Sequence, residues 1–134
     1  MQVQTHVDDE LSQFSRKQYL ALETYRRDGM PARTPVWFLE DNNRLLYVVT
    51  ESKSGKVKRI RNNHSVRIVP CSYKGRPEGK WLDAVATLLE DQGADEIKNM
   101  LNRKYGLAGK VVRFYHRITR GKEMQVVIRI QIKF

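Results

Sequence analysis

The sequence predicts a mainly β domain of the α+β class, in which about six antiparallel strands close into a small barrel with a few short helices around it. Its 134 residues are enough for one domain that buries a core without disulfides, and its one cysteine is Cys71. Segments rich in β-branched and aromatic residues recur along the chain, and tight turns separate several of them. Strands joined by tight turns are antiparallel, and six curved antiparallel strands bury their inner faces best as a barrel.

The first part of the chain is expected to contain a short helix and one arm of a β-hairpin. Leu11 and Phe14 have helical spacing, which predicts a helix over Asp9 to Phe14. The segment Gln18 to Tyr25 fits a helix or a strand by its pattern. The turn Arg27-Asp28-Gly29 that follows is typical of a hairpin and favours the strand.

The second arm of the hairpin and the next strand are predicted from β-forming residues. Ala32 to Leu39 is rich in such residues, and Pro35 within it cannot donate a hydrogen bond to a neighbour, so this strand is expected near a sheet edge or a bulge. A tight turn is expected at Asp41-Asn42-Asn43. Leu45 to Thr50 is continuously apolar, which is typical of a strand buried on both faces.

The second half of the chain is expected to mix short helices with strands. A short basic helix should begin near Gly55 and end at Asn62-Asn63, because asparagine tolerates the left-handed backbone that often ends helices. The remaining predicted elements are strands at Val66 to Cys71, Trp81 to Glu90 and Met124 to Phe134, a helix at Ala94 to Tyr105, and a further short helix considered at Val111 to Ile118. In the last strand one face carries Val126, Ile128, Ile130 and Ile132.

The charge of the chain favours an anionic partner. The formal net charge is +10 and the sequence pI is about 9.9. Two long stretches, Lys53 to Pro77 and Ile97 to Lys122, contain many Lys and Arg residues and no acidic residue. Such a balance suits nucleic acid, a phosphorylated small molecule or a polyanionic tail, and it does not choose among them.

A Ser/Gly/Lys loop between a strand and a helix is the strongest candidate for a binding site. The N-terminus of a helix exposes unpaired N–H groups and carries a partial positive charge, which suits a phosphate. Ser52 and Ser54 add hydroxyl donors, Gly55 allows close approach of the backbone, and Lys56 adds a full charge. The same residue types are common in ordinary solvated loops. The loop also differs from the P-loop of nucleoside triphosphatases, because the first glycine of that motif is replaced by Thr50 and the residue after the lysine is Val57.

No residue pattern in the chain predicts a catalytic side chain or a metal site. His6, His64 and His116 lie far apart in the sequence and have no cysteine at ligand spacing. A Gly-x-Ser-x-Gly nucleophile elbow is absent, and acidic residues occur at turns and helix starts. An enzyme with this sequence would therefore take its reactivity from a cofactor.

A cytoplasmic location is the simplest expectation from the sequence. No apolar run approaches the length of a membrane span. The N-terminal region carries Asp8, Asp9 and Glu10, whereas a signal peptide begins with positive charge.

An ordered set of short segments, from about Gln18 to the C-terminus, is similar to a known group of proteins. The segments are Tyr25-Arg26-Arg27-Asp28-Gly29-Met30-Pro31, Thr34-Pro35-Val36-Trp37-Phe38, Leu46-Tyr47-Val48-Val49-Thr50, Ser54-Gly55-Lys56 with Arg59-Ile60-Arg61-Asn62-Asn63, Arg76-Pro77 with Gly79 and Trp81, and Arg103-Lys104-Tyr105-Gly106-Leu107. In these segments the chain resembles the flavin and deazaflavin oxidoreductases of the split β-barrel superfamily, whose founding relative is pyridoxamine 5'-phosphate oxidase. It resembles the deazaflavin-dependent branch most.

The resemblance implies one six-stranded split-barrel domain over residues 1–134, which forms a homodimer with the cofactor in a groove at the subunit interface. It implies three groups of cofactor-binding residues: Ser54, Gly55 and Lys56 at the phosphate; Val49 and Thr50 at the bordering strand end; and Thr34, Pro35, Val36 and Trp37, whose backbone faces the tricyclic ring. By charge alone, Lys58 and Arg61 are further candidates for the phosphate or an acidic tail.

Departures from the family pattern narrow the expected activity. Thr34 and Leu39 stand where pyridoxamine 5'-phosphate oxidases carry basic residues, and the sequence ends at Phe134, before the C-terminal segment that those enzymes use for substrate. Oxidation of vitamin B6 is therefore not expected. A deazaflavin of the F-420 type, with its acidic oligoglutamate tail, would use the surplus Lys and Arg better than FMN, which is kept as the alternative cofactor.

The leading hypothesis is therefore an oxidoreductase that transfers hydride between a bound deazaflavin, or FMN, and a small organic substrate. The rival hypothesis is a nucleic-acid-binding module, in which basic stretches and aromatic residues form a groove for the backbone and bases. The aromatic candidates for that role are Tyr73, Trp81, Tyr105, Phe114 and Tyr115. A cofactor carrier without turnover is a third hypothesis.

Overall fold

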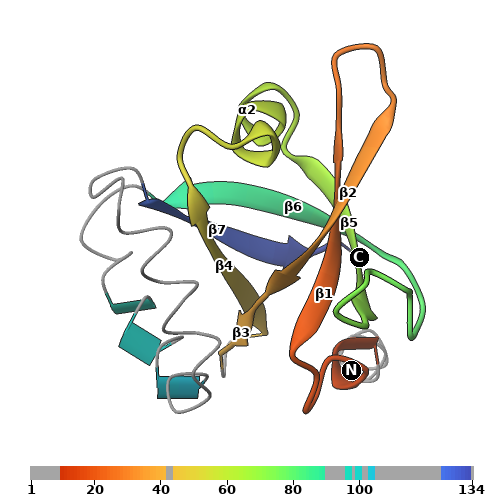
Figure 1. Ribbon diagram of the computed structural model, residues 1–134, viewed down its shortest axis with the longest axis vertical. Coiled ribbons are helices and arrows are strands. Elements are labelled where there is room, and N and C mark those ends of the chain that lie inside the picture. Colours follow the sequence, from red (N-terminus) through yellow and green to blue (C-terminus); the bar gives the residue numbers. More distant parts are fainter. Residues whose placement is uncertain are drawn as a thin grey trace.

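A curled antiparallel sheet makes up most of the molecule (Figure 1). The computed structural model describes residues 10–41, 44–89, 96–97, 99–100, 103–104 and 125–133. The strands are β1 (Tyr19–Tyr25), β2 (Pro31–Trp37), β3 (Leu39–Glu40), β4 (Leu45–Glu51), β5 (Ser65–Cys71), β6 (Leu82–Leu89) and β7 (Gln125–Ile132), and helix α2 (Gly55–Asn62) lies between β4 and β5. Mainly β structure with short peripheral helices is therefore confirmed.

The chain itself closes the sheet into a split barrel. The strand order is β2-β1-β5-β6-β7-β4-β3, so the two edge strands, β2 and β3, follow one another in the sequence. Only Phe38 separates them. The strand expected at Ala32 to Leu39 is therefore two strands, and the described sheet has seven strands where the sequence predicted six. The break occurs because the Phe38 side chain is fully buried in the core, while Leu39 pairs with Tyr47 at the opposite edge.

The predicted hairpin at the start of the sheet is confirmed. β1 and β2 pair antiparallel from Tyr19↔Trp37 to Tyr25↔Pro31, and their joining turn projects from the barrel (Figure 1). Gly29 has a φ of 87°, a left-handed conformation that glycine adopts without strain. β2 is an edge strand, as the proline at position 35 predicted.

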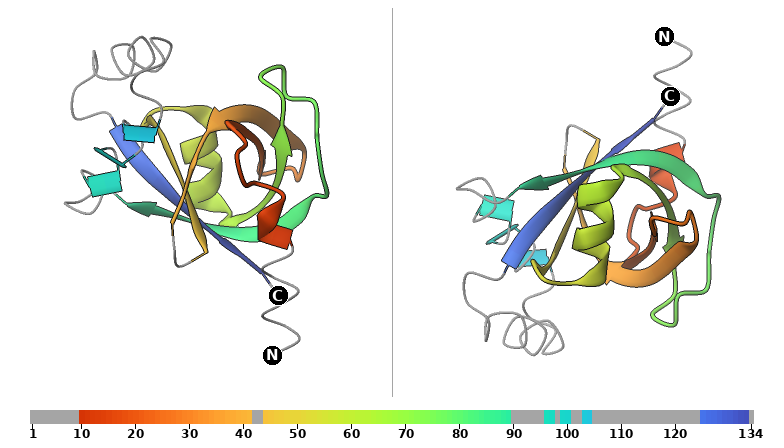
Figure 2. Two further views of the ribbon diagram at one scale, coloured as in Figure 1. Left: turned by 90° about the horizontal axis from the view of Figure 1, so that it is seen from below. Right: turned by 90° about the horizontal axis from the view of Figure 1, so that it is seen from above.

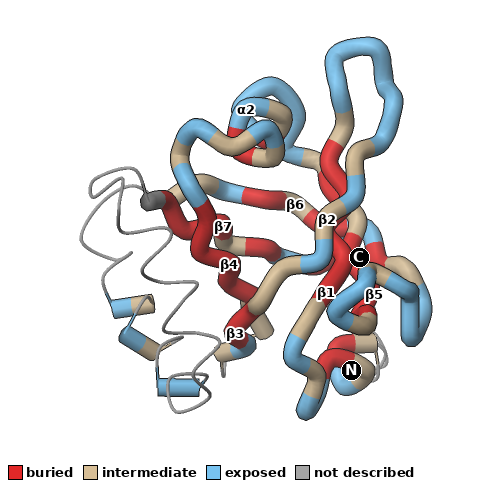
Figure 3. Tube along the Cα trace, in the orientation of Figure 1, coloured by how far each residue is buried: buried red, intermediate tan, exposed pale blue. Residues whose placement is uncertain are grey.

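Alternate residues of the strands fill the barrel, and short segments cover its two ends. The main core holds Leu20 and Leu22 of β1 together with every second residue of β7 from Ile128 to Ile132. Helix α2 covers one end, where Val57 and Ile60 are fully buried (Figure 2). The outer side of this helix is exposed (Figure 3). The N-terminal segment covers the other end, where the rings of Phe14 and Phe38 meet edge to face at 5.8 Å.

Part of the outer face of the sheet is covered by residues between β6 and β7. Val49 and Val127 belong to an outer apolar cluster, against which Ile97 and Met100 pack. Lys104 donates a hydrogen bond from Nζ to the carbonyl oxygen of Phe38 at 2.9 Å. The described residues among 96–104 are helical, in agreement with the predicted helix over Ala94 to Tyr105, whose other residues lie outside the described ones.

Other predictions are confirmed in part or lie outside the described residues. Helix α2 ends where predicted, but the cause was wrong: Asn63 is extended (φ −148°), and its side chain instead accepts a hydrogen bond from the Ser65 N–H at 3.0 Å. Residues 10–12 are helical and a turn follows, while Asp9 lies outside the described residues. The helix considered at Val111 to Ile118 and the Asn42-Asn43 turn residues also lie outside them. No helix in the described part of the chain is long and apolar enough to cross a membrane.

Candidate functional site

A groove lies at the split of the barrel, where the free edge of β2 approaches β4. Its volume is about 270 Å³, at the low end for a ligand site. β2 pairs with β1 alone within the described sheet, so its outer edge presents backbone N–H and C=O groups to the groove. The lining residues are Tyr19, Thr34, Pro35, Val36, Trp37, Val49, Thr50, Lys56 and Tyr73.

The structure brings together most of the residues that the sequence singled out. Seven of the eleven candidates line the groove: Thr34, Pro35, Val36, Trp37, Val49, Thr50 and Lys56. Ser54 and Gly55 lie beside it, as the N-cap and the first residue of α2. Lys58 and Arg61 are exposed on α2 and do not line the groove. Their role toward a cofactor stays a prediction.

The N-terminus of α2 carries a partial positive charge that no acidic side chain of its first turn offsets. The Ser54 side chain caps the helix and accepts a hydrogen bond from the Val57 N–H at 3.4 Å. The first turn of α2 contains no acidic residue, so no side chain of the helix neutralises its partial positive charge there. The N–H groups of Gly55 and Lys56 have no partner within the helix, because the first N–H groups of any helix lack one.

Lys56 is held at the groove in an unfavourable electrostatic position. Its Nζ donates a hydrogen bond to Thr50 Oγ1 at 3.3 Å. Burial lowers the pKa of Lys56 below its usual range, and repulsion by Arg59 lowers it further, while Glu51 partly offsets both. An anion bound at this position would favour the charged form of Lys56 and so oppose both effects.

Arg59 is a second cation at the same helix end, and the sequence reasoning missed it. Its Nε donates a hydrogen bond to Thr24 Oγ1 at 2.6 Å, and its guanidinium lies 2.7 Å from the position that a Cβ on Gly55 would take. Burial, followed by repulsion from Arg26, lowers the pKa of Arg59. Its spacing of three residues from Lys56 places both cations on one helix face, a signal that the sequence contained.

Aromatic rings and one buried hydroxyl complete the walls of the groove. Tyr19 and Trp37 lie 6.1 Å apart between ring centroids, with their planes tilted by 33°. Thr34 Oγ1 is buried and has no hydrogen-bond partner within the described residues, which is unusual and points to a missing ligand group. Tyr19 and Tyr73 were not predicted at the site. Tyr19 comes from β1 and Tyr73 from the turn between β5 and β6, whereas the predicted residues come from β2, β4 and the start of α2.

These features fit a phosphorylated, flat cofactor. A cation pair at a helix N-terminus suits a phosphate, and an apolar slot beside an open strand edge suits a planar ring that hydrogen-bonds to backbone groups. Among the residues that the structure describes, no carboxylate, histidine or cysteine that could act as an acid, base or nucleophile lines the groove. Any redox chemistry at this position would come from the bound group.

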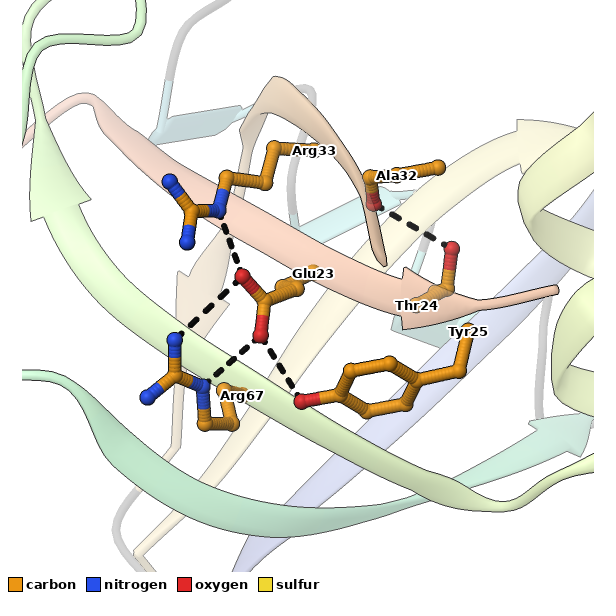
Figure 4. A network of polar contacts seen from close by, with 6 residues as sticks. All are labelled: Glu23, Thr24, Tyr25, Ala32, Arg33 and Arg67. Atoms are coloured by element: carbon orange, nitrogen blue, oxygen red, sulfur yellow. Dashed lines mark hydrogen bonds and ion pairs between the residues drawn. The ribbon is translucent and has the colours of Figure 1, made fainter. Parts of the chain in front are cut away.

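A second polar cluster lies on the outer face of β1 and satisfies its own charges (Figure 4). Glu23 is only 2% exposed and accepts hydrogen bonds from Tyr25, Arg33 and Arg67. Burial alone would raise the pKa of this carboxyl, but the hydrogen bonds outweigh it and hold the pKa at about 2. Arg33 and Arg67 each lie 4.8 Å from the ring centroid of Trp81. We call these five residues the Glu23 cluster.

Trp81 is therefore part of the Glu23 cluster, and this weakens its assignment as a stacking platform for nucleic acid. Two guanidinium groups that pair with the buried Glu23 carboxylate each contact the Trp81 ring. Of the two predicted aromatic platforms among the described residues, Tyr73 is the exposed one, at 66%. Tyr105, Phe114 and Tyr115 lie outside the described residues.

The described residues contain no metal site and no reactive thiol. No group of three His, Cys, Asp or Glu side chains among them could hold a metal ion. Cys71 is buried, and burial raises its pKa to about 11, so the thiol is neutral at physiological pH. His64 is exposed, and the other two histidines lie outside the described residues.

Comparison with known proteins gives a family match over nearly the whole chain. The family model of pyridoxamine 5'-phosphate oxidase matches residues 7–133. Among curated proteins, none matches this chain significantly.

Several solved structures share the fold. General Stress Protein 26 from Bacillus anthracis is 20% identical with a TM-score of 0.67, and the match covers 95% of this chain and 88% of that one. An F420 reductase is 23% identical with a TM-score of 0.62, covering 92% of both chains. HutZ, a haem storage protein from Vibrio cholerae, is 14% identical with a TM-score of 0.65, covering 100% of this chain and 92% of that one. At these identities the likeness establishes the fold alone.

Proposed function

The chain belongs to the pyridoxamine 5'-phosphate oxidase family, and on that premise we propose that it is a flavin- or deazaflavin-dependent oxidoreductase acting on a small organic substrate. One observation carries the proposal. Lys56 lines the groove at the N-terminus of α2, and the guanidinium of Arg59, a residue of the last turn, reaches back to Gly55 at the same end and repels Lys56. Neither cation pairs with a carboxylate within the described residues. Two cations kept in that arrangement are best explained by an anion that binds there.

The residues of the groove would divide the cofactor between them. Lys56, Arg59 and the α2 N-terminus would hold the phosphate, with Ser54 fixing the helix start. The β2 edge from Thr34 to Trp37 would face the ring, and the orphaned Thr34 hydroxyl would gain a partner there. A flavin or deazaflavin, when bound, supplies hydride transfer, and the protein contributes orientation and exclusion of water.

We propose a deazaflavin of the F-420 type as the first choice and FMN as the second. The exposed Lys58 and Arg61 lie on the same helix as the phosphate site and would attract an acidic tail that leaves the groove. The fold of the F420 reductase supports a place for such a cofactor on this scaffold, but not its identity. The net charge of +10 agrees with a polyanionic ligand.

A homodimer would complete the site. At about 270 Å³, the groove is smaller than most sites that enclose a drug-sized ligand, and it opens to the surface. A second subunit packed across the split would supply the missing wall and exclude water. The proposed function therefore includes a dimer with one cofactor groove for each chain.

Absorption and binding measurements test the proposal. The purified protein is examined for a yellow chromophore and is then titrated with the F-420 type cofactor and with FMN, following fluorescence. We expect saturable binding of one cofactor per chain, tighter for the deazaflavin. Absence of binding by both cofactors would overturn the proposal.

Turnover separates an enzyme from a carrier. The protein loaded with chemically reduced cofactor is mixed, without oxygen, with a panel of quinones and conjugated carbonyl compounds as hydride acceptors, and the change in cofactor absorbance is followed with and without each compound. Oxidation that is faster than that of the free cofactor indicates catalysis. Tight binding without any such acceleration indicates the carrier. Salt-sensitive binding of single-stranded nucleic acid, without cofactor uptake, indicates the nucleic-acid module instead.

A further inference from the structure

The turn between β5 and β6 forms a rigid wall at the outer end of the groove. Within this turn, the Ser72 N–H donates to the Arg76 carbonyl at 3.0 Å and the Gly75 N–H donates to the Ser72 carbonyl at 2.8 Å. The base of the turn is tied to the N-terminal segment, because Gln13 both donates to and accepts from the backbone of Lys80. The backbone of this turn is therefore held in place before a ligand arrives.

The turn lies at the end of the barrel away from α2 (Figure 1), and two contacts place it beside the groove. A Cβ on Gly75 would come within 3.8 Å of the Pro35 ring, and Pro35 lines the groove. Tyr73 of the turn lines the groove as well. It also lines two further cavities beside the turn, of about 480 and 660 Å³. We call these two cavities the outer compartment.

Tyr73 is an exposed aromatic wall shared by the groove and the outer compartment. Its side chain is 66% exposed, and Met30 is the one other large apolar residue with such exposure in the described part of the chain. Tyr19 likewise lines both the groove and the cavity of about 480 Å³, together with Arg16 and Lys17.

The outer compartment carries an excess of positive charge. Four cations line it: Arg16, Lys17, Lys74 and Arg76. Its one carboxylate, Glu78, pairs with Lys17 at 3.4 Å. The other three cations have no carboxylate partner within the residues that the structure describes, so an anion would find them available.

We propose that the outer compartment binds the anionic end of the substrate, with Tyr73 as a platform for a flat aromatic or conjugated body. This inference rests on the proposed function, because it assigns the cofactor to the groove and the substrate to the space next to it. The substrate class is therefore an aromatic or conjugated organic anion, such as a carboxylate. Of the two arginines in the compartment, Arg76 lies on the same turn as Tyr73, and a guanidinium can pair with two carboxylate oxygens, so Arg76 is given the larger share of the recognition.

A matched pair of probes tests the charge requirement. Naphthoate and its neutral analogue naphthamide have the same ring and nearly the same shape. Each is titrated by calorimetry into the protein already saturated with cofactor. We expect naphthoate to bind at least about ten-fold more tightly than naphthamide, since a hydrogen bond to a charged group contributes more than a neutral one. Equal affinities would overturn the proposal.

Variants assign the binding to the turn. Arg76→Gln should weaken naphthoate about ten-fold and leave naphthamide unchanged, whereas Tyr73→Ala should weaken both probes and Tyr73→Phe neither. Lys53→Gln removes an exposed charge outside the compartment and serves as the control. An equal effect of Lys53→Gln would show a non-specific charge effect and would also overturn the proposal.

Cofactor titrations of Arg76→Gln and of the unmodified protein distinguish a failure of the substrate role from a failure of the proposed function. Arg76→Gln should leave the affinity for the cofactor unchanged, with and without its acidic tail. Weaker binding of the tailed cofactor alone would assign the compartment to the tail and overturn the substrate role. Absence of cofactor binding by the unmodified protein would overturn the proposed function. The same probe titrations on the cofactor-free protein would then still decide whether the compartment binds organic anions.

Discussion

Two clusters of cations lie on opposite sides of β1 and differ in one component, a carboxylate. In the Glu23 cluster, two arginines surround a buried carboxylate, and hydrogen bonding to Glu23 raises the pKa of Arg67. At the start of α2, Arg59 contacts Thr24, the next residue along β1, and burial lowers its pKa. The first cluster is electrostatically complete without a ligand, and the second is not. A partly buried cation therefore indicates a binding site when no carboxylate of the protein balances its charge.

The largest expected effect is the loss of the carboxylate from the Glu23 cluster. Glu23→Gln keeps the shape of the side chain but leaves Arg33 and Arg67 facing each other without a charge between them. We expect the free energy of unfolding to fall by about 3 kcal/mol, measured by urea denaturation. The control is Glu51→Gln at an exposed position, which should change stability by less than about 0.5 kcal/mol. A loss that small in Glu23→Gln would contradict this role.

Acid should remove the same stabilisation in the unmodified protein. The pKa of Glu23 is about 2 when folded and 4.5 when unfolded, so its contribution is complete above pH 4.5 and is lost as the pH falls toward 2. The total loss should be on the order of 3 kcal/mol, by the size of this difference. Urea denaturation between pH 2 and 6 measures it. Glu23→Gln should show a correspondingly flatter dependence on pH, and parallel curves for the two proteins would refute the assignment.

In the cation pair at α2, the matching substitution removes a cation instead of a carboxylate. Lys56→Ala should raise the Kd for the cofactor about ten- to a hundred-fold, because a hydrogen bond to a charged group contributes about 1.5–3 kcal/mol. Apo-protein stability should not fall, since Lys56 is repelled by Arg59 before the cofactor binds. Fluorescence titration measures the affinity, with Lys53→Ala as the control on the preceding loop. An unchanged Kd would remove Lys56 from the site.

Arg59→Gln should separate stability from binding. The substitution relieves the repulsion on Lys56 and retains a donor for Thr24, so we expect apo-protein stability to change by less than about 0.5 kcal/mol. The Kd for the cofactor should rise about five-fold, which corresponds to about 1 kcal/mol. Thermal unfolding and fluorescence titration of the same preparation measure both quantities. A large loss of stability with an unchanged Kd would make Arg59 a structural residue.

The smallest effect is expected from Lys56→Arg, and it should appear in alkali. Burial lowers the pKa of Lys56, so the free protein loses this charge, and with it affinity for an anion, at a lower pH than an ordinary lysine would. Arginine stays protonated. Near neutral pH the two proteins should differ in cofactor affinity by less than about three-fold. Titrations in the same alkaline buffers should then show a steeper loss for Lys56, and identical pH profiles would contradict the lowered pKa.

Much of the fold and part of the site were predictable, because they depend on neighbours in the sequence. The Asp28-Gly29 hairpin, the alternation in β7 and the Ser54-Gly55-Lys56 helix start are local patterns. The Glu23 cluster was not predictable, because its carboxylate pairs with an arginine ten residues away and with another 44 residues away. Those pairs arise from the register of β1 with β2 and β5.

The same reason explains the misses at the groove and at the β2–β3 break. Tyr19 and Tyr73 reach the groove only once β1 and the β5–β6 turn are in place. Arg59 is adjacent to Lys56 on the helix surface, but the sequence alone did not show which of the basic residues of α2 face inward. Phe38 interrupts an apolar run that has the pattern of one strand. The run divides there because the residues before Phe38 pair with β1 and those after it pair with β4, and these pairings are long-range.

The one-residue link at Phe38 sets a limit on how this molecule can evolve. The two sheet edges are a single residue apart, and Lys104 both donates to the Phe38 carbonyl and lies 4.3 Å from its ring centroid. Substitutions here would alter packing. An inserted or deleted residue would do more, because it would turn every later side chain of the short β3 strand to the opposite face and change the width of the split. Relatives of this chain should therefore vary in length at their exposed turns while the distance in sequence between the two edge strands stays constant.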